Sequence, residues 1–126
     1  MILMTFRAAW RLQIVLLLLL LIGTQMPNAW RAGIEGSLHL PWGISSWAHL
    51  VLFASMAWVA SAHLGWRAPR ILLVALALAL LTEGLQYFAI NRHPRLLDVG
   101  IDLAGAGLAI GLAWLATQWA RFGNRP

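Results

Sequence analysis

The stretch IVLLLLLLIG, from Ile14 to Gly23, decides the class of fold, because six consecutive leucines stand inside an uncharged run. With its flanks this run covers residues 8–26, and a membrane-spanning helix needs about 20 apolar residues. Three further apolar stretches follow, over residues 45–64, 71–90 and 96–119. The pattern predicts an all-α fold, an integral membrane four-helix bundle with short loops and no soluble domain, as one membrane domain over residues 1–126.

The composition agrees with a membrane protein and excludes several kinds of site. Of the 126 residues, 61% are hydrophobic and 10% are charged, whereas soluble domains carry about 25% charged residues. Cysteine is absent, which excludes disulfides and cysteine-ligated metals. The histidines are scattered, and we expect no metal and no cofactor. The net charge of +5 comes from arginines in short segments between the apolar runs, so we expect orientation signals and no nucleic-acid binding.

The arginines also predict the orientation of the chain in the membrane. Cytoplasmic segments carry an excess of basic residues. Counting the N-terminus as cytoplasmic places six arginines inside and three outside, at positions 7, 11, 67, 70, 121 and 125 against positions 31, 92 and 95. We therefore expect a multi-pass protein of the bacterial cytoplasmic (inner) membrane with both termini in the cytoplasm.

The segment between the first two apolar runs is expected to form a loop, because it contains Pro27, Asn28 and the glycines Gly33 and Gly36. The sequence around Pro27 is a poor match to a signal-peptide cleavage site. We therefore expect the first span to remain in the protein.

Five polar residues stand within the predicted spans, where ionisable groups are costly and usually face the bundle interior or a wet cavity. Counted from the turn around residue 93, Glu83 and Asp102 lie at nearly equal depth on neighbouring antiparallel helices. The expected pocket, near one membrane surface and capped by arginines of the turn, contains His49, Glu83, Gln86, Arg92, Asp98 and Asp102. Two interpretations remain open: the arginines neutralise the acids, or an arginine receives an anionic head group such as a phosphate.

Small residues in the last span indicate where another helix can approach. Gly105 and Ala109 continue the helix face that carries Asp98 and Asp102, and we expect a tight interface between the third and fourth spans. Gly107 and Gly111 form a GxxxG pair on an adjacent face, which would also allow oligomer formation.

The segment from Glu83 to Gly105 resembles the signature of VanZ-like membrane proteins. That pattern is a Glu-x-x-Gln at the end of one span (Glu83 and Gln86), an Arg in the next loop (Arg92), and an Asp and a Gly in the following helix (Asp98 and Gly105). His49 resembles the family's histidine at the start of an earlier span. The resemblance covers residues 45–115.

Two positions depart from the VanZ-like pattern. Asp102 stands where the family usually has Asn, which adds a carboxylate, and Ser45 and Ser46 stand where an Asp-Lys pair is common. The resemblance implies a bacterial cell-envelope context, with a namesake associated with teicoplanin resistance. The partners that it implies are membrane lipids and an anionic lipid-linked cell-wall precursor or lipoglycopeptide.

Three functions follow as expectations. The first is a binding protein that contributes to glycopeptide resistance without turnover. The second is an intramembrane enzyme or carrier for polyprenyl or phospholipid head groups, with Glu83 or Asp98 as acid or base; it ranks lower because no nucleophile with an adjacent base is apparent. The third is a small proton-coupled exporter, which is disfavoured because the first span has no acidic residue.

Overall fold

The computed structural model describes residues 4–39, 43–89 and 93–123, and within them the chain forms five helices joined by short connections. In chain order these are α1 (Phe6–Gln25), α2 (Asn28–Leu38), α3 (Ile44–Ala62), α4 (Ala68–Gln86) and α5 (Leu96–Gly123). All except α2 are long and apolar enough to cross a membrane. This confirms the predicted all-α membrane fold with four spans.

Short-range signals explain several helix ends. The hydroxyl of Thr5 accepts a hydrogen bond from the backbone N–H of Ala8 and caps the start of α1. Pro69 lies in the first turn of α4, where the missing N–H of proline costs nothing. Between α3 and α4 the chain reverses at Gly65, whose φ of +67° is a conformation that glycine adopts without strain.

The segment expected as a loop after the first span is helical, so that prediction was wrong. Pro27 stands directly before α2, and its carbonyl accepts hydrogen bonds from the backbone N–H groups of Trp30 and Arg31. Arg31 and Glu35 then form an ion pair one turn apart, with 3.8 Å between Nε and Oε1. Pro27 therefore caps the start of a helix, and Gly33 and Gly36 are tolerated inside that helix.

Two predicted span ends also differ from the structure. The third span was expected to continue to residue 90, but α4 ends at Gln86. The next N–H groups, of Tyr87, Phe88 and Ala89, bond to carbonyls three residues earlier, so the α-helical pattern stops while the sequence is still apolar. At the other end of the chain, α5 continues to Gly123.

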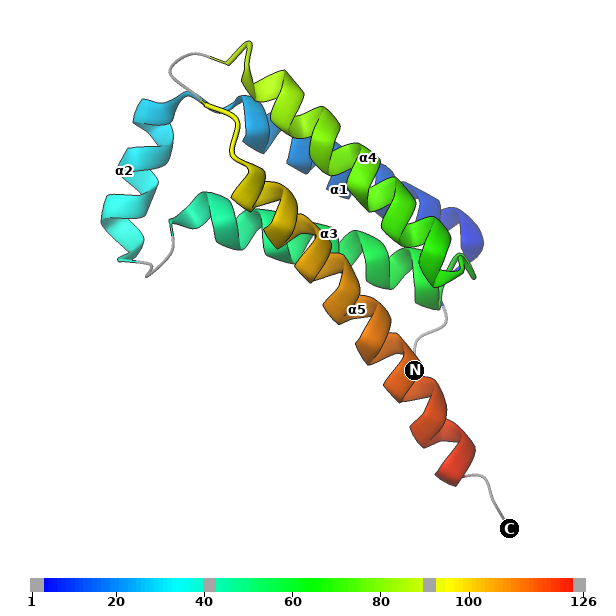
Figure 1. Cartoon of the computed structure of the whole chain (residues 1–126). Coiled ribbons are helices and arrows are strands. Elements are labelled where there is room, and N and C mark those ends of the chain that lie inside the picture. The colour runs from blue at the N-terminus through cyan, green and yellow to red at the C-terminus, as the bar shows by residue number, and fades with distance from the viewer. Residues whose placement is uncertain (1–3, 40–42, 90–92, 124–126) are drawn as a thin grey trace.

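Helix α3 is the centre of the bundle and contacts each of the other four helices. Helix α5 packs most extensively on α3 and next on α4, and its C-terminal half projects beyond the other helices (Figure 1). The shared core is rich in alanine, which lets helices approach closely in a membrane. Its buried residues are Leu20, Phe53, Met56, Ala57, Ala60, Ile71, Ala75, Ala79, Val99, Ala106 and Ala109.

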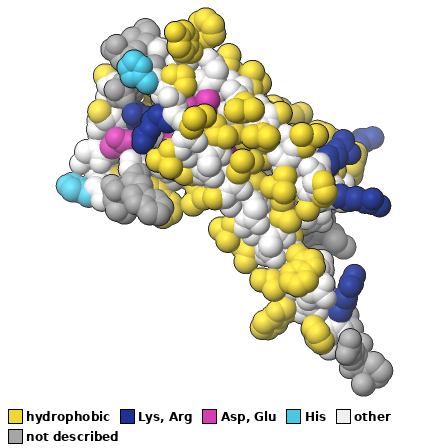
Figure 2. All heavy atoms as spheres, viewed as in Figure 1, with side chains coloured by type: hydrophobic (Ala, Val, Ile, Leu, Met, Phe, Trp, Pro, Cys, Tyr) yellow, Lys and Arg dark blue, Asp and Glu magenta, His cyan; other side chains and the backbone are white. Residues whose placement is uncertain are grey.

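The surface carries charge at its ends and hydrophobic side chains between them (Figure 2). Large apolar side chains are exposed along the spans, among them Ile22, Leu73, Leu108 and Trp114. Such a surface suits a lipid environment, where exposed apolar side chains carry no penalty. The structure thus supports a membrane-embedded bundle with two polar ends.

Candidate functional site

Five polar side chains lie buried at the end of the bundle where α3 begins, α4 ends and α5 begins. Each is at most 6% exposed. His49 stands in the second turn of α3, and the remaining four lie in the last turn of α4 or near the start of α5. We call this group the polar cluster: His49, Glu83, Gln86, Asp98 and Asp102.

The shortest contact between side chains of different helices in the polar cluster joins α3 to α5. The Nδ1–H of His49 donates to Oδ1 of Asp102 across 2.7 Å, and Asp102 is fully buried. The imidazole also stacks on the ring of Phe53, with 6.4 Å between centroids and 5° between planes. Because Nδ1 is bonded to the carboxylate, Nε2 is the ring nitrogen that can accept a proton. The arrangement holds the histidine in one orientation.

Glu83 has both carboxylate oxygens engaged by neighbouring groups. Oε1 accepts from Nε2 of Gln86 at 3.0 Å, and Oε2 accepts from the backbone N–H of Arg95 at 2.6 Å. The second bond ties the end of α4 to the segment that begins α5. Glu83 therefore fixes the position at which α5 begins. The sequence placed Glu83 and Asp102 at similar depth, but the hydrogen bonds of Glu83 are to Gln86 and Arg95.

Two aspartate oxygens in the polar cluster are buried and have no hydrogen-bond partner among the described residues. They are Oδ1 of Asp98 and Oδ2 of Asp102, one turn apart on α5. A buried acceptor without a partner costs about 1–3 kcal/mol. A hydrogen-bond donor or a proton is the group that these oxygens would take.

A groove at the molecular surface adjoins the polar cluster. It has a volume of about 480 Å³ and is lined by residues of α2, the start of α3, the segment before α5 and the first turns of α5, including Arg31, Ser45, Ser46 and Arg95. Figure 2 shows arginine and acidic side chains gathered at this end of the molecule. A second hollow shares Arg31 and Ser45 with the groove and reaches His49. Two arginines and two serines thus line the groove, and the neighbouring hollow that shares Arg31 and Ser45 with it is the one that includes His49.

Some of these groove residues were not predicted. Arg31 was counted only as an orientation signal, because its segment was expected to be a loop. Ser45 and Ser46 were noted only as departures from a family pattern. The one available signal was the four-residue spacing of Arg31 and Glu35, which is typical of a helix. Arg92, which was predicted as part of the site, lies outside the described residues.

The three glycines expected to pack helices lie in different surroundings. A Cβ built on Gly105 would stand 2.5 Å from the carbonyl oxygen of Leu50 and 3.3 Å from the backbone nitrogen of Ala54, both on α3. The tight interface was expected between the third and fourth spans, but the closest approach of α5 is to α3. Gly107 and Gly111 have no neighbour within 4 Å of a built Cβ and are exposed on α5.

The described residues contain no group of three or more His, Asp or Glu side chains arranged to hold a metal ion. The chemistry that the site offers is hydrogen bonding and proton exchange by one histidine and three carboxyl groups, next to a groove with two arginines.

Comparison with known proteins identifies one relationship. The sequence model of the VanZ/LLP1 family matches residues 3–117, which covers the first three spans and most of the fourth. No curated protein and no solved structure matches the chain.

Proposed function

The chain belongs to the VanZ/LLP1 family, and from this premise we propose that it is a bacterial cell-envelope protein that binds the anionic head group of an amphipathic ligand. The observation that carries the proposal is the groove in which Arg31 and Arg95 lie beside Ser45 and Ser46. Arginine is suited to phosphate and carboxylate because its planar guanidinium donates two parallel hydrogen bonds. The ligand class is a lipid-linked cell-wall precursor or a lipoglycopeptide.

The surroundings of the groove support an amphipathic ligand. The hollow that shares Arg31 with the groove is otherwise lined largely by apolar residues, among them Leu20, Ile34 and Leu52. A head group between the two arginines would leave an apolar chain next to these side chains. Glu35 competes for Arg31, but its distance of 3.8 Å and partial exposure make that ion pair weak.

The proposal predicts protection against teicoplanin that depends on the groove arginines. In a susceptible Gram-positive host, we expect the wild-type chain to raise the inhibitory concentration by several doubling dilutions. Arg31→Ala and Arg95→Ala should each remove most of this increase, because each deletes a guanidinium that would bind the ligand. Arg121→Ala, at the far end of α5, is the matched control and should keep the increase. All variants are compared at equal membrane levels.

No increase with the wild-type chain would contradict the teicoplanin role. Direct binding of a polyprenyl phosphate to the purified protein then tests the wider proposal. Equal binding by wild type, Arg31→Ala and Arg95→Ala would overturn the assignment of the groove.

A second candidate function, an intramembrane enzyme acting on lipid head groups, is favoured by the 2.7 Å bond between His49 and Asp102. A carboxylate on Nδ1 orients an imidazole to accept a proton at Nε2, as in many hydrolases. Glu83 fits an acid or base less well, because both of its oxygens are engaged. If His49→Gln abolishes a measured turnover but leaves head-group binding unchanged, the enzyme candidate replaces the binding protein.

Two further points remain proposals. We propose that the chain lies in the cytoplasmic membrane with both termini inside, which places the polar cluster and the groove toward the outer face.

We also propose that copies of the chain associate through Gly107 and Gly111, because this face of α5 is exposed and free of close neighbours. Proton-coupled export receives no support from α1, which has no acidic residue.

A further inference from the structure

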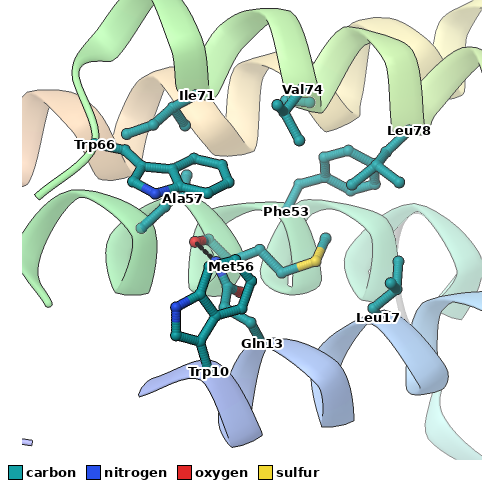
Figure 3. Close-up of a pocket in the computed structure, with 12 residues that line it drawn as sticks. Trp10, Gln13, Leu17, Phe53, Met56, Ala57, Trp66, Ile71, Val74 and Leu78 are labelled. Atoms are coloured by element: carbon teal, nitrogen blue, oxygen red, sulfur yellow. Dashed lines mark hydrogen bonds between the residues drawn. The ribbon is translucent and has the colours of Figure 1, made fainter. Parts of the chain in front are cut away.

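A further hollow, distinct from the one that reaches His49, lies toward the other end of the bundle, between α1, α3 and α4 (Figure 3). Its volume is about 150 Å³, and its wall is apolar except for one amide side chain and two indole rings. Phe53 lines this hollow and stacks on His49, so it separates the hollow from the polar cluster. An apolar cavity of about this volume is large enough to hold a benzene molecule, or a short stretch of hydrocarbon chain.

The amide belongs to Gln13, which stands inside the first span. Its Nε2 donates to the backbone carbonyl of Met56 across 3.0 Å, as the dashed line in Figure 3 shows. Its Oε1 is buried and has no hydrogen-bond partner among the described residues. Such an acceptor costs about 1–3 kcal/mol to leave unpaired. The amide is thus held by its donor end, and its unpaired acceptor belongs to a residue that lines the apolar hollow.

Aromatic contacts form one side of the hollow. The rings of Trp10 and Trp66 meet edge to face with 6.1 Å between centroids. The guanidinium of Arg70 lies over the ring of Trp66, 4.1 Å from its centroid. A cation over an indole face is a favourable contact, and it holds Trp66 in place. The wall is therefore present before any ligand enters.

The chemistry of the hollow limits what can bind there. Because Gln13 presents an acceptor, a bound molecule must bring a donor. An ammonium group would be costly at this depth in a membrane, and an anion would meet no free donor of Gln13. A neutral hydroxyl on a hydrocarbon chain satisfies both conditions. We propose that this hollow is a binding site for a long-chain alcohol, whose hydroxyl donates to Oε1 of Gln13 and whose first carbons contact Phe53 and Met56.

The test compares a bromine-labelled long-chain alcohol with its methyl ether, using the full chain in lipid nanodiscs. The chain has eight tryptophans, so the six other than Trp10 and Trp66 are replaced by phenylalanine in every protein compared. Bromine near Trp10 and Trp66 then quenches the remaining fluorescence, and quenching against the mole fraction of probe reports occupancy of the hollow. We expect the alcohol to reach half-saturation at a mole fraction roughly 3- to 10-fold lower than the ether, which is the effect of one hydrogen bond. Gln13→Leu should remove this difference. Gln118→Leu, on α5 outside the hollow, is the matched control and should retain it.

A cavity-filling variant provides the second measurement. Val74 lines the hollow and is partly exposed, so Val74→Phe should fill the space without disturbing the core and should weaken quenching by both probes. Equal half-saturation of alcohol and ether in the wild type, or quenching unchanged by both Gln13→Leu and Val74→Phe, would overturn the proposal. Arg31→Ala and Arg95→Ala act at the other end and should leave quenching unchanged. Failure here is therefore distinguishable from failure of the head-group proposal.

Discussion

Gly105→Ala is expected to destabilise the protein, whereas Gly100→Ala, five residues earlier on the same helix, is expected to leave it unchanged or slightly more stable. A Cβ at Gly105 would stand 2.5 Å from the carbonyl oxygen of Leu50, which belongs to the backbone of α3 and cannot rotate away. The helices would have to separate, and overpacking of this kind costs about 1–3 kcal/mol. At Gly100 a Cβ meets open space, and alanine favours helix by up to about 1 kcal/mol.

Thermal unfolding of the two variants in the same detergent, followed by circular dichroism, measures the difference. The two substitutions change the same atoms on the same helix, so their general effects on helix propensity cancel. Equal unfolding temperatures of Gly105→Ala and Gly100→Ala would show that α5 is not tightly packed against α3 at Gly105. The polar cluster should respond as well, because the spacing that Gly105 permits also brings His49 to Asp102.

The four spans could be predicted from the sequence because hydropathy is a local property. Each span is a run of apolar residues of sufficient length, and in lipid such a run forms a helix because the surroundings cannot hydrogen-bond its backbone. The end of α4 could not be predicted in this way, because residues 87–89 are as apolar as the helix before them. Helix α2 was missed for a different reason: its 11 residues mix apolar with polar side chains and include two glycines, and its helical signal is one ion pair.

The buried polar residues could be identified from the sequence, but their partners could not. Equal depth suggested that Glu83 faces Asp102, whereas in the structure Glu83 bonds to Gln86 and to the backbone of Arg95. Which helix lies next to the face of Asp102 depends on how closely two backbones can approach. Gly105 allows α5 to approach α3 closely, so α3 is the neighbour of this face. The contact joins positions about 50 residues apart, and helical periodicity does not predict it.

The second large effect is expected at the pair formed by His49 and Asp102. His49→Leu should destabilise the protein by about 3–5 kcal/mol, because it leaves the buried carboxyl group of Asp102 without a partner for either oxygen. Asp102→Leu should cost less, because it leaves a neutral imidazole with one unpaired nitrogen. The double variant should be more stable than the sum of the two losses predicts. Removing both polar partners avoids a lone buried group, so we expect a coupling energy of about 1–2 kcal/mol.

Asp102→Asn is the control that separates hydrogen bonding from charge. The amide oxygen of asparagine can still accept from Nδ1–H of His49, so this variant should lose less than half of the stability lost by Asp102→Leu. Asparagine is also the residue that the VanZ-like pattern has at this position. The double-mutant cycle compares the unfolding free energies of the wild type, His49→Leu, Asp102→Leu and the double variant. If the loss in the double variant equals the sum of the two single losses within about 0.5 kcal/mol, the 2.7 Å contact contributes nothing to stability. If Asp102→Asn retains stability but loses a measured turnover, the negative charge of Asp102 is needed for the reaction. In that variant the orientation of His49 would be unchanged, but its basicity would be lower.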